Sequence, residues 1–452
     1  MLPVIFFSVL SILIVVGKAL RGRIPLLHRL SLPSSVVGGL VGLVIFNALK
    51  DHIPADWVKD MRQVPSFLIN VIFATLFLGS GMPKLRKLAG GALPQLTLAQ
   101  IAAWGQYVVG IGLAGYVLMP LFNVSPAFGN LLELGFEGGH GTVGGMTATF
   151  DKFGWGEGVA LGYTVATIGM IFGIIMGMAL VNRAYRKGFV KTVLPFEERS
   201  ESERIGIHPP DSRPSAGRQT VRPSSVDSLA WHIAVVGVAV TIGYGMLKGF
   251  QLAETCLFPE AKTRLFDGFP LFPLCMIGGV LLQGLAGLFK VDLLVDRGQM
   301  QRVSGAALDY LSVSAVATIE LSVVASNWLP LTIMIVAGAV WTVAAVLFLA
   351  PRLFKEAWFE RGITEFGQAT GVTATGLLLL RTVDPDNETP AASSFAAKQL
   401  FHEPIMGVWV AMAFSLVFNV GWQKVFYISI VVLAFWSIVA TVLIIRRRRG
   451  NL

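Results

Sequence analysis

Glycine and threonine are concentrated in two semi-polar stretches of an otherwise apolar chain. These stretches are LLELGFEGGHGTVGGMTATFDKFG (131–154) and ITEFGQATGVTATGLLLLRTVD (363–384). Glycines let a chain turn without a Cβ penalty, and the N-terminus of a half-helix presents N–H donors with partial positive charge to a carboxylate. Backbone carbonyls and threonine hydroxyls can replace the hydration shell of a small cation. The predicted chemistry is therefore the binding of a carboxylate together with a cation.

The positions predicted to line this site are all glycines or threonines of the two stretches. They are Gly138, Gly139, Gly141, Thr142, Gly144, Gly145, Thr370, Gly371, Thr373, Thr375 and Gly376. For any one of them the alternative is that a small residue only lets helices pack closely.

The first stretch also carries Glu133, Glu137 and His140. The spacing Glu137-x-x-His140 occurs in di-iron helical bundles, but those bundles need the motif twice on continuous helices. Here Gly138 and Gly139 interrupt the single copy, so no metal site is predicted. A structural role, contact with a bound solute and proton coupling all stay open for His140.

Two further charged residues are candidates for the site. Glu320, in ATIELSVV, is predicted to lie well inside a hydrophobic span, where a charge costs about 2.5–3.5 kcal/mol on insertion scales. It is either a cation or proton site or a residue near the outer end that reaches headgroup water. Arg381 follows four leucines at the end of the second stretch, where it could meet a carboxylate or anchor the chain at the membrane interface.

The composition excludes several classes of protein. Of the 452 residues, 54% are hydrophobic and 14% are charged, and the mean hydropathy is +0.68. Such a chain is a membrane protein rather than a soluble enzyme or a nucleic-acid-binding protein, although its net charge is +9. Cys256 and Cys275 are too few for a disulfide framework.

Eleven apolar runs are long enough for membrane-spanning helices of about 20 residues. They cover 2–17, 31–49, 64–82, 92–119, 156–182, 229–250, 269–289, 304–325, 329–350, 404–421 and 424–445. With the N-terminus outside, 28 of the 36 Lys and Arg residues fall on the inner side. This asymmetry follows the positive-inside rule and predicts a cytoplasmic C-terminus.

The chain is predicted to be all-α and to contain two related halves. A Pro33/Gly38-Gly39 pattern recurs as Pro273/Gly278-Gly279, and Ala74-Thr75 recurs as Ala317-Thr318. Residues 1–190 and 229–421 are the predicted repeats, with five spans each. Residues 191–228 are rich in Ser, Pro and charge and are predicted to be a flexible cytoplasmic linker. Residues 422–452 add one more span and a basic tail.

An odd number of spans before the linker gives the second half an inverted topology, as in many secondary transporters. Each Gly/Thr stretch then begins and ends on one side of the membrane. We expect two re-entrant hairpins, 131–154 from outside and 363–384 from inside. Irregular backbone is tolerated at membrane depth only when it is buried in protein or lines a wet cavity, so two opposed hairpins predict a central polar site.

The fragments GFEGGHGTVGGM (135–146) and ATGVTATGLLLLRTVDP (369–385) resemble the hairpin motifs of the bacterial sodium/glutamate symporter family. The resemblance extends in weaker form over 1–190 and 229–421, and GGHGT is its most specific part. The family's motif positions fall on Gly138, Gly139, His140, Gly141, Thr142, Thr373, Ala374, Thr375 and Gly376. Glu137 and the final span are additional to the family's pattern.

The resemblance implies a homodimer in the bacterial inner membrane. In it, a transport domain would carry a small carboxylate, with sodium as coupling ion and no other cofactor, past a fixed scaffold. We therefore expect sodium-coupled uptake of glutamate or a related carboxylate by alternating access. The alternatives are a proton-coupled transporter of another organic anion and a channel. An intramembrane enzyme would require a paired nucleophile and base, which His140 alone does not supply.

Overall fold

The fold is given by a computed structural model in which residues 2–29, 32–50, 52–79, 85–190, 200–259, 266, 269–385 and 388–448 are described. Over these residues the chain is helical and forms no strand. The predicted all-α membrane class is confirmed at this level. Parts of the predicted spans (31 and 80–82), of the linker (191–199) and of the tail (449–452) lie outside the described residues.

Seven described helices are long and apolar enough to cross a membrane by length and composition. They are α1 (Leu2–Arg23), α6 (Leu85–Leu113, continued through η1, Ala114–Leu118, and α7, Met119–Phe122), α11 (Glu157–Arg186), α13 (Ser228–Leu257), α17 (Trp328–Leu353), α19 (Ala391–Val420) and α20 (Trp422–Arg448).

The helices in the other four predicted spans do not meet both criteria of length and apolar composition. Three are apolar but short: α3 (Ser34–Ala48), α5 (Gln63–Thr75) and α14 (Phe272–Leu288). At 1.5 Å per residue, the 15 residues of α3 extend only about 22 Å. The fourth, α15 (Arg297–Ala317), begins seven residues before the predicted start and ends eight residues before the predicted end. Residues 318–320 leave the helix, and α16 (Leu321–Ser326) follows as a separate short helix.

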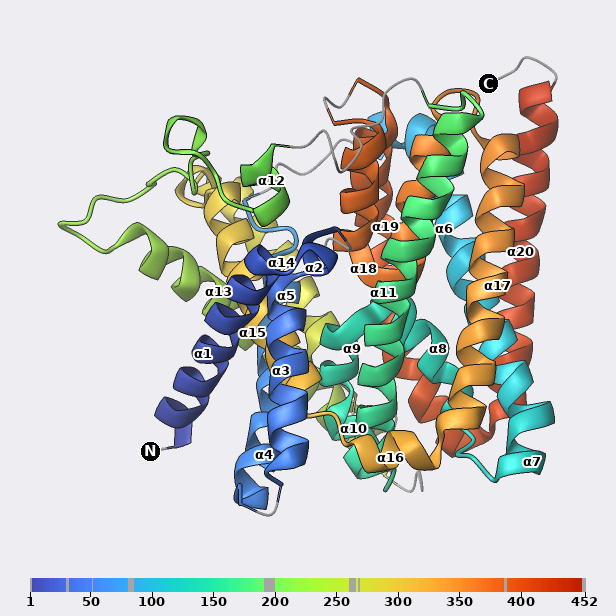
Figure 1. Ribbon diagram of the computed structural model, residues 1–452, viewed down its shortest axis with the longest axis horizontal. Coiled ribbons are helices and arrows are strands. Elements are labelled where there is room, and N and C mark those ends of the chain that lie inside the picture. The colour runs from blue at the N-terminus through green and yellow to red at the C-terminus, as the bar shows by residue number, and fades with distance from the viewer. Residues whose placement is uncertain are drawn as a thin grey trace.

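The helices gather into two bundles (Figure 1). The α15 bundle consists of α1, α3, α5, α13, α14 and α15, in which α3 and α5 pack on α15 and α14 packs on α5 and α13. The α11 bundle consists of α6, α11, α17, α19, α20, α18 (Trp358–Val383) and the short helices between residues 128 and 152. Both bundles combine helices from before and after the proposed linker.

The repeated Gly-Gly patterns occupy matching positions within the α15 bundle. Gly38 approaches the backbone of α1, and Gly278 approaches the backbone of α13. The following residues, Gly39 and Gly279, face α15 and α5 respectively. A side chain larger than hydrogen at these positions would collide with the neighbouring helix, so the glycines let α3 and α14 pack closely on both sides.

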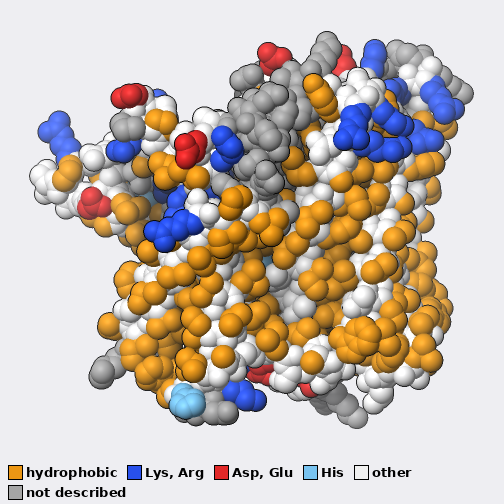
Figure 2. All heavy atoms as spheres, viewed as in Figure 1, with side chains coloured by type: hydrophobic (Ala, Val, Ile, Leu, Met, Phe, Trp, Pro, Cys, Tyr) orange, Lys and Arg blue, Asp and Glu red, His pale blue; other side chains and the backbone are white. Residues whose placement is uncertain are grey.

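The two ends of the molecule differ in charge (Figure 2). Hydrophobic side chains cover the middle of the visible face, and Lys and Arg side chains gather along its upper edge. The upper end carries the C-terminal part of α20, where Arg447 donates hydrogen bonds to the carbonyl oxygens of Pro351 and Arg352. The lower end carries α4 (Ala55–Met61), α7, α10 (Thr147–Lys152) and α16.

Candidate functional site

Helix α11 brings the two Gly/Thr stretches together. A Cβ at Gly162 would contact Val143, and one at Gly169 would lie 2.6 Å from Phe136 and 2.7 Å from the carbonyl oxygen of Thr370. Further along α11, Gly173 faces Thr370, and Gly177 faces α18. One half of α11 therefore packs on the first stretch and the other half on the second, which is possible because glycine removes the side chain at each crossing.

The first stretch is broken at a glycine. It runs through α8 (Leu131–Glu133), a π-helical turn η3 (Leu134–Gly138), α9 (Gly139–Gly145) and α10. Gly139 has φ +67° and ψ −169°, a conformation that is essentially restricted to glycine. In Figure 1, α8 and α9 lie at mid-height while α10 lies at the lower end.

The second stretch folds back on itself within α18. The helical geometry is interrupted at Gly371 and Val372, which separates residues 358–370 from residues 373–383. A Cβ at Gly376 would lie 2.5 Å from the carbonyl oxygen of Thr364. In a straight helix these residues would be about 18 Å apart along the axis, so the two limbs run side by side.

The two breaks meet. A Cβ at Gly139 would collide with Cγ1 of Val372. Val372 has φ +61° and ψ 175°, close to the conformation of Gly139. The prediction that the two stretches converge therefore agrees with their positions in the structure.

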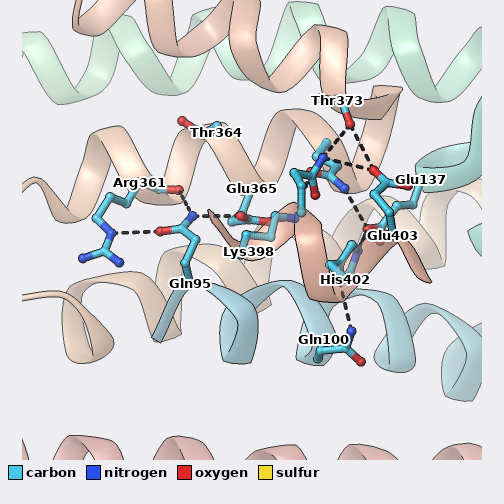
Figure 3. A network of polar contacts seen from close by, with 12 residues as sticks. Gln95, Gln100, Glu137, Arg361, Thr364, Glu365, Thr373, Lys398, His402 and Glu403 are labelled. Atoms are coloured by element: carbon cyan, nitrogen blue, oxygen red, sulfur yellow. Dashed lines mark hydrogen bonds and ion pairs between the residues drawn. The ribbon is translucent and has the colours of Figure 1, made fainter. Parts of the chain in front are cut away.

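A chain of buried polar contacts leads from one limb of α18 toward this junction (Figure 3). Lys398 Nζ donates to Glu365 Oε2 and to Gln368 Oε1, each at 2.9 Å. Gln95 Nε2 donates to Glu365 Oε1 at 2.8 Å, and Arg361 Nε donates to Gln95 Oε1 at 2.8 Å. Since Lys398 and Glu365 are almost completely buried, each charge needs the other as its partner.

The next group of contacts joins Gln100, His402 and Glu137. Trp104 Nε1 donates to Gln100 Oε1 at 2.8 Å, so the Gln100 amide nitrogen faces His402 Nδ1 at 3.1 Å. The nitrogen Nδ1 then accepts a hydrogen bond, and the ring proton lies on Nε2, which donates to Glu137 Oε1. His402 therefore connects helix α6 to Glu137 of the first stretch.

A third group surrounds the first residue of the returning limb of α18. Gln399 Nε2 donates to Thr373 Oγ1 at 2.8 Å and to Glu403 Oε1 at 3.0 Å. Thr373 Oγ1 also donates to Glu403 Oε1 at 3.3 Å. Two buried oxygens beside this group, Glu137 Oε2 and Gln399 Oε1, have no hydrogen-bond partner within the described part of the chain.

Five of the predicted site residues lie at the junction or immediately beside it: Gly138, Gly139, Gly371, Thr373 and Thr375. Thr370 lies between α18 and α11, and Gly376 lies between the two limbs of α18. Both residues contribute to packing there. Ala374 is exposed. The Thr142 hydroxyl donates to the carbonyl oxygen of Gly138 at 2.8 Å and so supports the break itself.

Three predicted glycines face the α15 bundle rather than the junction. A Cβ at Gly141 would lie 2.6 Å from Ile69 Cδ1, and one at Gly145 would lie 2.5 Å from Phe272 Cδ1. Gly144 faces α5 as well. These small residues form the contact surface between α9 and the other bundle.

His140 points away from Glu137. Its Nε2 lies 2.9 Å from Thr167 Oγ1 on α11, and its ring stacks on that of Tyr163. Because the Thr167 hydroxyl proton is donated to the Tyr163 carbonyl, His140 donates to Thr167. Among the described residues no group of three or more His, Cys, Asp or Glu side chains could hold a metal ion.

The expected position of Glu320 inside a span is wrong. The helix ends at Ala317, and Glu320 lies between α15 and α16, with 42% of its side chain exposed and an ion pair to Arg62. It lines a cavity of about 820 Å³ between the two bundles, together with residues that include Asn47, Thr147 and Tyr163. Arg381 is exposed near the end of α18.

The sequence analysis missed the charged part of the site. It placed residues 351–403 outside the spans, whereas α19 begins at Ala391 and carries Lys398, His402 and Glu403 on its buried first half. No local signal in the sequence marks these residues, because each of them contacts a residue of another segment.

Comparison with known proteins gives one family. A family model described as sodium/glutamate symporter matches residues 4–358. A curated relative from Haemophilus influenzae, named sodium/glutamate symporter, is 28% identical over 172 residues. This alignment covers 37% of the present chain and 40% of the relative, so it spans less than half of either protein.

Proposed function

Because this chain belongs to the sodium/glutamate symporter family, we propose that it takes up glutamate or a related carboxylate into the cell, driven by sodium. Membership of a symporter family identifies a transporter rather than an enzyme. The observation that carries the proposal is the contact between the two backbone breaks, at Gly139 and Val372. Two interrupted helices that meet inside an apolar protein are the usual construction of a solute site in secondary transporters.

In this proposal residues 131–154 and 363–384 are re-entrant hairpins that enter the membrane from opposite sides. All eleven helical segments cross the bilayer, in two inverted repeats with one additional span. The N-terminus lies outside and the C-terminus in the cytoplasm. The basic residues at the end of α20 support this orientation, since Lys and Arg are retained on the cytoplasmic side.

The breaks supply the groups that the solutes need. The returning limb of α18 begins at Thr373, next to the junction, and the N–H groups at the start of a helix attract a carboxylate. Sodium is expected to bind unwound carbonyls and the hydroxyls of Thr373 and Thr375. Gly138, Gly139 and Gly371, at the junction, allow the backbone to come close to the solutes.

Movement of the α11 bundle against the α15 bundle would expose the junction alternately to each side. The contact of Gly141, Gly144 and Gly145 with α5 and α14 supports this division, because small residues let two surfaces slide with little interlocking. The cavity at Glu320 lies between the bundles and is lined by Tyr163, on which His140 stacks. It would admit solutes from the outer side. The α15 bundle would form the fixed part of a homodimer.

Uptake by the purified protein in liposomes tests this proposal. Labelled glutamate and other amino and organic acids are supplied with sodium and proton gradients imposed separately. We expect saturable glutamate uptake that follows the sodium gradient, and a lower rate in Thr373→Ala and Thr142→Ala. Uptake that does not saturate would indicate a channel, and uptake driven only by protons would exclude sodium coupling.

A further inference from the structure

The acidic residues at the junction exceed the cations that face them. Lys398 pairs with Glu365 and also attracts Glu137 and Glu403, so one lysine faces three carboxylates, while Arg361 lies at the far end of the same limb (Figure 3). At the junction itself Glu137 and Glu403 lie next to each other, and His402 lies beside both and hydrogen-bonds to Glu137. Two buried carboxylates that lie side by side repel each other, so a further cation at this position would stabilise them.

The unused hydrogen-bonding capacity shows where such a cation would lie. The Glu137 side chain is 7% exposed, yet its Oε2 atom has no partner among the described residues. Gln399 Oε1 is likewise buried without a partner, while the amide of the same residue donates to Thr373 and Glu403. Free oxygens of Glu137 and Gln399 and the carboxylate of Glu403 together offer acceptors to a group with several N–H donors.

The positive end of the returning limb of α18 is adjacent to these acceptors. Thr373 is the first residue of that limb and hydrogen-bonds to Gln399 and Glu403. The region thus combines N–H donors for an anion with acidic oxygens for a cation. An α-amino acid carries its carboxylate and its ammonium group on the same carbon atom, which matches this adjacent pair of opposite polarities.

We infer that Glu137, Glu403 and Gln399 bind the ammonium group of the substrate and so select amino dicarboxylates against dicarboxylates that lack an amino group. The inference rests on the proposed function. It assigns a role in substrate specificity to Gln399 and Glu403 on α19 and to Glu137, which precedes the glycines of the first stretch. The ammonium group donates its hydrogen bonds to the acidic oxygens, while the α-carboxylate accepts from N–H groups at the start of the returning limb.

Competition between glutamate and glutarate, which differs from it only in lacking the amino group, tests the inference. Wild-type protein, Glu137→Gln, Glu403→Gln and the control Glu388→Gln are reconstituted in liposomes under one fixed inward sodium gradient. Glu388 is exposed in the turn after α18 and undergoes the same loss of charge. Wild type and control should prefer glutamate to glutarate by about tenfold or more, because a site that binds an N–H group rejects analogues without it.

In Glu137→Gln and Glu403→Gln the KM for glutamate should rise about tenfold. The inhibition constant of glutarate should stay within about threefold of the wild-type value. The two variants should therefore bind glutamate and glutarate with nearly equal affinity. Retained binding of glutarate shows that the variants are folded. Thermal shifts of the detergent-solubilised variants that are nearly equal for glutarate and glutamate would give the same answer without transport.

Two results would overturn the inference while leaving the proposed function intact. One is a wild-type protein that takes up glutamate and binds glutarate equally well. The other is a pair of variants that keep the preference for glutamate but need a higher sodium concentration for half-maximal uptake, since the acidic residues would then bind sodium. Absence of any sodium-driven glutamate uptake by wild type would instead contradict the proposed function.

Discussion

Lys398 and Glu365 form an ion pair whose side chains are 0% and 1% exposed. Removing one partner leaves an uncompensated charge in an apolar interior, which destabilises proteins by about 3–5 kcal/mol. We expect Lys398→Met to lower the melting temperature of the solubilised protein strongly. Lys355→Met, at an exposed position, should leave it nearly unchanged. The measurement is thermal unfolding of the purified variants in detergent.

Removing the charges of both Lys398 and Glu365 shows whether the two side chains stabilise the protein as a pair or independently. Replacement of a buried pair by apolar side chains of similar size is often neutral or stabilising. Lys398→Met combined with Glu365→Met should therefore recover most of the stability lost in the single variant. If the double variant is less stable than Lys398→Met alone, the two side chains do not compensate each other.

At the scale of the element, the return of α18 depends on two facing glycines. A Cβ at Gly376 would lie 2.5 Å from the carbonyl oxygen of Thr364, and one at Gly367 would lie 2.6 Å from the Cα atom of Gly376. We expect Gly376→Ala to push the limbs apart, to destabilise the protein by about 1–3 kcal/mol and to reduce uptake severely. The measurements are thermal unfolding and initial uptake rate.

The matched control is Gly237→Ala on α13, where a Cβ would meet nothing within 4 Å. Alanine in place of a helical glycine stabilises by about 0.5–1 kcal/mol, so this variant should be as stable as wild type or slightly more stable. Equal behaviour of Gly376→Ala and Gly237→Ala would show that the two limbs of α18 do not pack against each other.

The breaks in the helices could be predicted from the sequence because their signal is local. Gly138-Gly139 and Gly371 interrupt helical runs by their own backbone preferences, and the threonines nearby provide hydrogen bonds to the freed carbonyls. Glu320 could not be placed in this way. The predicted span 304–325 that contains Glu320 is an apolar run, and only the packing of α15 shows that its helix ends at Ala317, three residues before Glu320.

The charged part of the site depends on contacts between distant segments. Lys398 looks like a residue of a cytoplasmic loop until α18 folds back and brings Glu365 and Gln368 against α19. Glu137 likewise has no visible role until His402, 265 residues away, donates to it. Long-range pairing of this kind leaves no periodic pattern in the sequence, which is why the predicted site contained the glycines and threonines but not their charged neighbours.

At the scale of the whole molecule, the proposed topology would make the two hairpins accessible from opposite sides. Asp151 in α10 and Arg381 in α18 are both exposed. In a background without Cys256 and Cys275, Asp151→Cys should react with a membrane-impermeant maleimide from outside the cell. Arg381→Cys should react only after the cytoplasmic side is opened. Labelling of both cysteines from the same side would contradict the inverted arrangement.

If transport requires relative motion of the two bundles, a covalent link between the bundles must stop transport. Gly141 in α9 and Ile69 in α5 contact each other across the bundles, with 2.6 Å from a Cβ at Gly141 to Ile69 Cδ1. Oxidation of the pair Gly141→Cys and Ile69→Cys should abolish uptake, and a reductant should restore it. The measurement is sodium-driven glutamate uptake before and after reduction.

A second pair separates restricted motion from general damage. Gly42 and Ala317 contact each other within the α15 bundle, where a Cβ at Gly42 would lie 2.7 Å from Ala317 Cβ. If that bundle moves as one unit, oxidation of Gly42→Cys and Ala317→Cys leaves its internal geometry unchanged and uptake continues. Uptake that survives the link between bundles would mean that the solute crosses while the contact of α9 with α5 stays closed, and the hairpins alone would then have to open and close the site.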